Sequence, residues 1–317
     1  MSGYTPDTSG INPDLKPNYR NSQPNFTVFM SSIKIILTHP GGAHKDEFLA
    51  CSVLLALHPV PVMRREPTQD DLADAATCVV DVGHRHEPAL NNFDHHQLPK
   101  EHPPTCSLSL VLQHLGLYED ARQFCLWLEP AEWFDCRGLV TTAQWLGTSP
   151  ETVSKLISPI DITLLRRFAL AKRVEPGQPL WEVMRMIGED LLDYVKTLRA
   201  RLDLIGRQAE IWELELAGRP ARILFLPRTE PLPDEPSMGI DQFIESRGLG
   251  AEIVGIVYPD RRSTGYGLSR FKDNSRLDFT RVAGLPDVHF THARGFVAKT
   301  SASEIGRLKQ LVSQAGV

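Results

Sequence analysis

The stretch Ile33-Lys-Ile-Ile-Leu-Thr38, followed by His39-Pro-Gly-Gly42, decides the fold that the sequence predicts. Its first six residues form a mostly apolar, β-branched run, which is typical of a buried strand, and the proline and glycines after it favour a turn. From Asp46 to Leu57 apolar residues recur at helical spacing, with acids in the first turn, where the helix dipole favours negative charge. We therefore expect a strand, a loop and a helix, in that order.

The same alternation continues along the chain. Strands are predicted at residues 61–64 and 77–82, with a short acidic helix at 69–75 between them. Strands that alternate with helices imply crossover connections and a parallel sheet. Beyond Thr105 the pattern turns helical, and we predict helices at residues 107–115, 119–128, 131–146, 150–155, 161–173 and, as one long amphipathic helix, 180–210.

The last third of the chain returns to strands. We predict two strands at 211–216 and 221–226, a hairpin formed by 250–258 and 264–271, and a final helix at 303–315. The expected fold is therefore α/β, with an N-terminal parallel-sheet domain that has helices on both faces and a smaller C-terminal α/β domain. The predicted boundaries are a disordered tail at 1–30, a first domain at 31–180, a connecting helix at 181–210 and a second domain at 211–317.

Composition excludes several classes of protein. Of the 317 residues, 42% are apolar and 23% are charged, which is ordinary for a globular chain and speaks against collagen, coiled coil and general disorder. No apolar run approaches the roughly 18 to 20 residues that span a bilayer, so we expect no membrane partner. The five cysteines are widely spaced and never form C-x-x-C, which favours free thiols and a cytoplasmic location.

Charge is distributed unevenly along the chain. The net charge of −5 speaks against a surface that binds nucleic acid all over. From residue 255 to 317, however, ten lysines and arginines stand against five acids. We expect the C-terminal end to face an anionic partner.

Histidines gather in the first third of the chain, where eight of the eleven lie between residues 39 and 102. Imidazoles and carboxylates together bind divalent transition metals. Asp81 and Asp94 stand at or near predicted strand ends, and Asp46 follows the first loop. Because the carboxyl ends of parallel strands meet at one edge of a sheet, these side chains are expected to lie close together.

Three clusters are candidates for this chemistry. His39, His44 and Asp46 lie on the first loop, although the same residues suit a plain strand-to-helix turn. Asp81 closes a strand in Asp81-Val-Gly, where a simple turn residue is the alternative. Asp94-His95-His96 is the most informative, because adjacent imidazoles beside an acid have little packing value. The other histidines of the region, together with the next one along the chain, are predicted to be structural: His58, His84, His86, His102 and His114.

The three clusters carry a resemblance to a known family. The order His-x4-His-x-Asp, Asp-Val-Gly, Asp-His-His resembles the DHH phosphoesterase superfamily. The sequence between Ile33 and Gln97 is similar to that of the melanocyte-proliferating-gene branch of this superfamily. The segments 132–138 and 290–296 resemble that branch's helical Asp-x-x-Asp-Asn-Gly motif and its C-terminal His-x-x-Gly-Phe motif. The chain departs from the pattern where Cys136 replaces the usual asparagine, at Lys45, and at 298–299.

The resemblance implies a DHH-type catalytic domain with a two-metal site. Manganese is the expected ion, with magnesium or zinc as alternatives. It implies that Asp81 bridges both ions, that Asp94 orients His95, and that His96 faces the scissile phosphate. The full ligand set that the resemblance implies is His39, His44, Asp46, Asp81, His95 and Asp135.

The second domain is expected to bind substrate. Arg270 and the segment around His292, Arg294 and Gly295 are the candidates for phosphate contacts, since arginine forks match phosphate oxygens and glycine allows close backbone approach. A solvated surface charge is the alternative for each arginine.

Three functions remain open from the sequence. The first is a metal-dependent phosphodiester hydrolase, a 3′-5′ exonuclease on RNA or short oligonucleotides, which is the activity linked to the resembling branch. The second keeps the metals and changes the substrate to pyrophosphate or a cyclic dinucleotide. The third is a metal-binding regulatory protein without turnover. A homodimer is left open.

Overall fold

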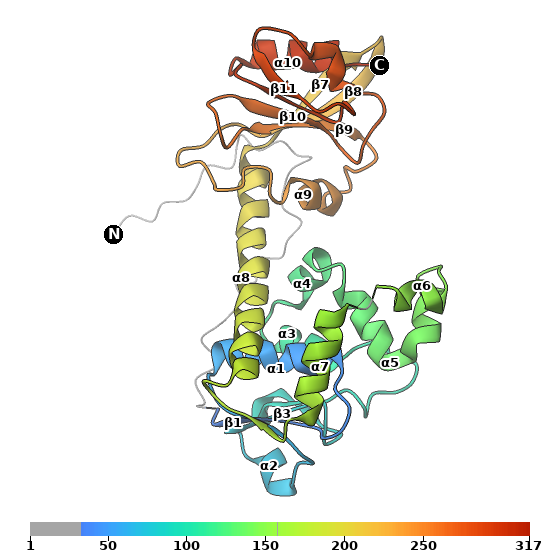
Figure 1. Cartoon of the computed structure of the whole chain (residues 1–317), viewed down its shortest axis with the longest axis vertical. Coiled ribbons are helices and arrows are strands. Elements are labelled where there is room, and N and C mark those ends of the chain that lie inside the picture. The colour runs from blue at the N-terminus through green and yellow to red at the C-terminus, as the bar shows by residue number, and fades with distance from the viewer. Residues whose placement is uncertain (1–32, 157) are drawn as a thin grey trace. The chain divides into compact units, whose positions relative to one another are not determined.

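The computed structural model describes residues 33–156 and 158–317 (Figure 1). They form two compact units, and the chain passes from one to the other between Thr197 and Leu198. Each unit is described by itself. The tail predicted at 1–30 lies outside the described residues.

The first unit is built on a six-stranded sheet whose central four strands are parallel. The strand order is β4-β5-β3-β1-β2-β6, and the edge strands β4 and β6 pair antiparallel with their neighbours. The parallel sheet is confirmed for β1, β2 and β3, whereas the two-residue strands carry too little pattern to predict. The strands are β1 Ile35–Thr38, β2 Val62–Arg64, β3 Thr77–Val80, β4 His86–Glu87, β5 Asn92–Phe93 and β6 Arg173–Val174.

Helices lie on both faces of this sheet. Figure 1 shows α2 on the opposite side from α1, α3 and α7. The predicted helix at 161–173 runs too far, because α7 ends at Leu170 and Arg173 pairs in β6. The helices are α1 Lys45–Leu57, α2 Gln69–Ala73, the 3-10 turn η3 Pro88–Leu90, α3 Ser107–His114, α4 Tyr118–Phe124, α5 Leu128–Trp145, α6 Pro150–Ser154 and α7 Pro159–Leu170.

The long helix α8, Pro179–Gln208, agrees with the predicted helix at 180–210. In the part of α8 that belongs to the first unit, Trp181, Met184 and Val195 are buried. At Gly188 the helix approaches α1 so closely that a Cβ would lie 1.9 Å from the carbonyl oxygen of Ser52. Glycine is therefore required at this crossing of two helices.

The second unit contains another six-stranded sheet, in the order β11-β12-β10-β9-β8-β7. Only β8 and β9 pair in parallel, and β9 with β10 forms the predicted hairpin. The elements are β7 Glu210–Leu216, β8 Arg219–Phe225, α9 Ile240–Ser246, β9 Ile253–Pro259, β10 Tyr266–Arg270, the 3-10 turn η4 Phe279–Val282, β11 Val288–Thr291, β12 Val297–Thr300 and α10 Ile305–Gln314. Sequence analysis missed α9, β11 and β12.

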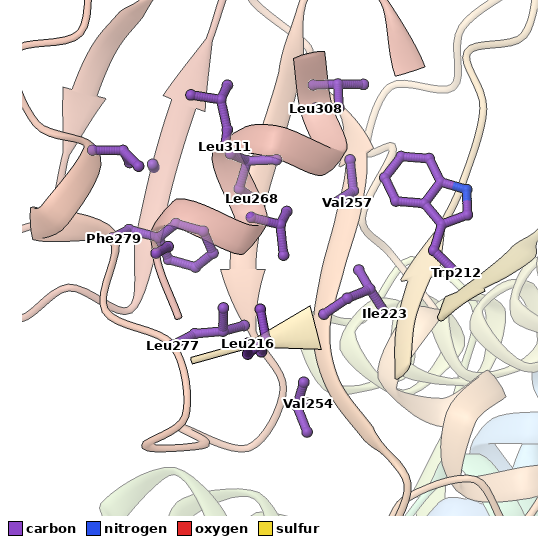
Figure 2. Close-up of a cluster of buried hydrophobic side chains, with 14 of the residues drawn as sticks. Trp212, Leu216, Ile223, Val254, Val257, Leu268, Leu277, Phe279, Leu308 and Leu311 are labelled. Atoms are coloured by element: carbon purple, nitrogen blue, oxygen red, sulfur yellow. The ribbon is translucent and has the colours of Figure 1, made fainter. Parts of the chain in front are cut away.

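Helix α10 and the sheet enclose a core of their own. Figure 2 shows Leu308 and Leu311 of α10 among buried side chains of the strands, including Trp212, Ile223 and Leu268. The second unit therefore holds its own hydrophobic core, as an independently packed body does.

Within the described residues, none of the helices combines the length and the apolar character needed to cross a membrane.

Candidate metal centre

Each candidate cluster begins one residue after a strand of the first sheet ends. His39 follows β1, Asp81 follows β3, and Asp94 follows β5. These three strands are parallel and adjacent, so their carboxyl ends share one edge of the sheet. The topology brings the three clusters together for the reason that the sequence predicted.

The first loop turns directly into α1. Gly41 has a φ of 89°, a conformation that suits glycine, and His44 is the N-cap residue of α1. Asp46 and Glu47 occupy the first helical turn, but the helix dipole is only part of the reason for their placement. Their side chains are buried, at 1% and 0% exposure, and lie in the cluster.

Asp81 lies at the centre of the arrangement. Its φ of 60° is left-handed, a region that aspartate tolerates better than most residues. Oδ1 accepts a hydrogen bond from Ser107 Oγ at 2.8 Å and lies 3.1 Å from His95 Nε2, while Oδ2 lies 3.5 Å from His39 Nε2. One carboxylate thus reaches side chains from two different clusters.

Helix α5 supplies the remaining predicted ligand. Asp135 Oδ2 lies 2.9 Å from His95 Nε2, and its Oδ1 lies 3.6 Å from His44 Nδ1. All six predicted ligands are therefore gathered in one place. Their donor atoms, with four further side chains, form four overlapping groups: His39, His44, Glu47 and Asp81; Asp81, Asp94, His95 and His96; His95, Asp135 and Cys136; and His44, Asp46 and Asp135.

Unsatisfied atoms inside the cluster fit a bound cation. Asp46 Oδ1, His95 Nε2 and Asp135 Oδ2 are buried and have no hydrogen-bond partner among the described residues. His95 and Asp135 approach closely but lack the alignment of a hydrogen bond. Buried polar atoms rarely stay without a partner, and nitrogen and carboxylate oxygens are suitable ligands for divalent metals. The residues therefore fit metal ions.

Protonation without a metal follows from the crowding of charges. Interaction with Asp81, and then with Glu47, raises the pKa of His39 to about 10. At His95, burial lowers the pKa of the imidazole, but interactions with Asp135 and Asp81 outweigh burial and raise that pKa to about 12. Burial, and then the charges of Asp81 and Asp135, raises the pKa of Asp46. The metal-free cluster therefore holds protons, which must leave when a metal binds.

The expected role of Asp94 is wrong in one respect. Its Oδ1 is 2.7 Å from Nδ1 of His96, not of His95, and it also accepts from the backbone N–H of His96 at 3.0 Å. His95 instead turns its Nδ1 toward Cys136 Sγ, 3.9 Å away. The sequence could not show which of two adjacent imidazoles faces the acid, because that depends on how the chain turns after β5.

The sequence indicated no role for Arg64 and, for Glu47, none beyond the helix dipole. Glu47 Oε2 lies 2.8 Å from His39 Nε2, and Oε1 accepts from Arg64 Nη2 at 2.9 Å. Arg64 also donates to the carbonyl oxygens of Gly41, Gly42 and Phe168. The available signal was a charged residue at the end of β2, a strand that is otherwise apolar.

A cavity of about 350 Å³ opens beside the cluster. His39, His44, Asp81, Asp94 and His96 contribute to its lining. His84, which the sequence assigned a structural role, also lines it. The cluster is therefore accessible to a ligand.

The predicted substrate residues form a separate group in the second unit. The backbone N–H of Arg270 donates to Phe296 at 2.9 Å, and a Cβ on Gly295 would lie 3.3 Å from Arg270 Nη2. The backbone N–H of Arg294 donates to His292 Nδ1 at 3.1 Å. The structure thus gathers these four residues around the turn between β11 and β12.

Part of the chain matches the model of a known protein family. Residues 35–116 match the family model MYG1_exonuc, described as an uncharacterised protein family (UPF0160). The MYG1_exonuc segment runs from β1 to just beyond α3, so it contains every candidate ligand up to His96 and leaves out Asp135. This part of the chain is therefore similar to MYG1-type proteins. No curated protein matches the chain.

Proposed function

We propose that the chain is a metal-dependent phosphodiester hydrolase that acts on RNA or short oligonucleotides as a 3′-5′ exonuclease. The observation that carries this proposal is the convergence on Asp81: three parallel strands and α5 bring imidazole and carboxylate atoms together in overlapping groups, each with its atoms within 4.8 Å of one another. The similarity of residues 35–116 to MYG1_exonuc supports the same class of reaction.

Charge balance supports two divalent ions. The cluster contains five carboxylates that are buried or nearly so, namely those of Asp46, Glu47, Asp81, Asp94 and Asp135. Among the described residues, Arg64 is the one arginine or lysine that pairs with any of them. When all five are ionised, Arg64 and a protonated His96 leave three negative charges. Buried charge is strongly unfavourable unless it is compensated. One divalent cation would leave a negative charge uncompensated, whereas two would not.

Each candidate ligand has a proposed role in metal binding. His39, His44 and Asp46 would hold ions from the first loop, Asp81 would bridge them, and His95 with Asp135 would complete the set. When bound, a pair of divalent cations supplies an activated water and stabilises negative charge on the phosphate. Manganese is the proposed ion.

His96 contributes a hydrogen-bond donor to the phosphate. The hydrogen bond to Asp94 raises the pKa of His96 and holds its Nδ1, which leaves Nε2 for a ligand in the cavity. A protonated imidazole at that point donates to a phosphate oxygen. In the second unit, Arg270, His292, Arg294 and Gly295 are proposed to hold the substrate backbone.

The test is Asp81→Asn, which removes the bridging charge and keeps the size of the side chain. We expect manganese-dependent release of mononucleotides from a labelled single-stranded RNA to fall by at least about a thousandfold, with the circular dichroism spectrum unchanged. Asp70→Asn, an exposed acid on α2, is the control and should keep full activity.

Retained turnover in Asp81→Asn would refute the two-metal assignment. Phosphate release from pyrophosphate, with no product from RNA, would show that pyrophosphate is the substrate and RNA is not. Metal binding without either reaction would favour the regulatory alternative.

A further inference from the structure

Part of the cavity beside the metal centre is built by residues that the proposed reaction does not use. They come from two segments, one between β2 and the end of α2 and one after β3. The residues of this wall are Glu66, Pro67, Gln69, Leu72, Val82 and His84, with Gly83 between the last two.

The chemistry of this wall fits an organic group better than a second phosphate. The wall has apolar surface from Pro67, Leu72 and Val82. None of the residues that line the cavity is a lysine or an arginine. A phosphate subsite needs cationic or multiple N–H donors. Small-molecule sites instead combine apolar surface with a few polar groups that fix orientation.

Two polar side chains of the wall are available to a ligand. Glu66 and Gln69 are exposed, and their side chains make no hydrogen bond or ion pair within the part of the chain that the structure describes. Asp71, close by, differs: its carboxylate is bound by Arg65 and Thr68. Carboxylate and amide groups of this kind bind the hydroxyl and amino groups of a nucleoside.

The wall is formed in advance. A Cβ on Gly83 would lie 2.8 Å from Leu72 Cδ2 and 3.2 Å from Pro67 Cγ, so the two segments pack directly on each other. Asn92 Nδ2 donates to the carbonyl oxygen of Leu72 at 2.9 Å. A ligand therefore does not have to order this wall when it binds, which favours affinity.

We infer that this cavity holds the nucleoside attached to the cleaved phosphodiester, and that Glu66 and Gln69 hydrogen-bond to that nucleoside. The inference rests on the proposed phosphodiester hydrolysis and makes these two residues determinants of specificity. It also excludes inorganic pyrophosphate as the preferred substrate.

The test compares two substrates with the manganese-loaded full chain. A ribodinucleotide carries the hydroxyl and amino groups, whereas bis(p-nitrophenyl) phosphate has a phosphodiester without such donors. In Glu66→Ala and in Gln69→Ala, we expect KM for the dinucleotide to rise about three- to tenfold with kcat unchanged, because each variant loses hydrogen bonds to the nucleoside. KM for bis(p-nitrophenyl) phosphate should stay the same.

Asp70→Ala is the matched control, since it removes an exposed negative charge next to Gln69 on α2, at a residue outside the cavity lining. It should leave both substrates unaffected. A second readout is equilibrium binding, measured by calorimetry with the manganese-loaded protein. Adenosine monophosphate should bind at least about tenfold more tightly than inorganic phosphate, and Glu66→Ala should narrow that difference.

The outcomes separate the inference from the proposed function. If bis(p-nitrophenyl) phosphate is hydrolysed but both cavity variants behave like Asp70→Ala, or if pyrophosphate is the better substrate, the inference is wrong and metal-dependent hydrolysis stands. If no phosphoester is hydrolysed, the proposed function fails. Equal binding of adenosine monophosphate and phosphate would then overturn the inference independently.

Discussion

Arg64 shows how a residue outside the candidate ligand set controls the centre. Its side chain is buried, and its guanidinium bonds three carbonyl oxygens and Glu47 at once, with its Cζ 4.5 Å from the centre of the Phe168 ring. Two of those carbonyls belong to Gly41 and Gly42, in the loop that carries His39 and His44. Arg64 therefore both holds the loop that contains Gly41 and Gly42 and balances the charge of Glu47.

We expect Arg64→Lys to weaken manganese binding by about ten- to a hundredfold. A lysine ammonium is a point charge that cannot reproduce the fork of the guanidinium, and groups that orient metal ligands affect affinity on this scale. The measurement is a manganese titration followed by electron paramagnetic resonance. Arg65→Lys is the control, because Arg65 pairs with Asp71 away from the centre. Equal affinities in the wild type and Arg64→Lys would contradict this role.

Residue patterns predicted which side chains gather at the candidate centre better than they predicted the orientation of those side chains. The three clusters were found because imidazole and carboxylate types are chemically distinctive, whereas Asp135 was named only by the resemblance to a known family. Glu47 was assigned to the helix dipole, which explains an acid at that position but not its complete burial. The partner of Asp94 was predicted one residue too early, because side-chain direction after β5 depends on the turn that follows.

At the scale of elements, α8 approaches α1 through Gly188. An alanine would improve the helix propensity of an exposed position by about 1 kcal/mol. Here its Cβ would meet the backbone of Ser52 at 1.9 Å, and backbone cannot rotate away as a side chain can. The steric effect therefore outweighs the propensity.

We predict that Gly188→Ala lowers the free energy of unfolding of the first unit by about 1–3 kcal/mol, the range of overpacked cores. Urea denaturation monitored by fluorescence would measure it. Asp190→Ala, an exposed substitution two residues along the same helix, should change stability by no more than about 0.5 kcal/mol. An equal effect of the two variants would show that α8 and α1 do not touch at Gly188.

Long elements were predicted well and short ones poorly. Helices α1 and α8 and strands β7 to β10 show periodic apolar patterns over several residues. By contrast, β4, β5 and β6 contain two residues each. These strands form because they pair with neighbouring strands, and the local sequence does not indicate that pairing. Those pairings place the Asp94 cluster beside Asp81.

At the scale of the whole molecule, the candidate ligands lie in the first unit and the predicted phosphate-binding residues in the second. Metal binding should therefore stabilise the two units unequally, since a ligand stabilises the part whose folding forms its site.

We expect removal of manganese by a chelator to increase amide hydrogen exchange around His39, Asp81 and His95 at least about tenfold. Exchange in strands β7 to β12 should not change. Hydrogen-exchange mass spectrometry of the full chain measures both regions in one sample. The internal control is the second unit, and an equal change in both units would argue against a metal centre confined to the first.

The sequence by itself determined the α/β class, the long elements and the residues capable of metal chemistry, because apolar periodicity and side-chain type are local properties. The tertiary structure decided which imidazole faces which acid, that Arg64 binds Glu47, and that residues 66–72 join the loop after β3 in one cavity. These are contacts between segments far apart in the chain, and their geometry is fixed by packing and strand pairing, which no local pattern contains.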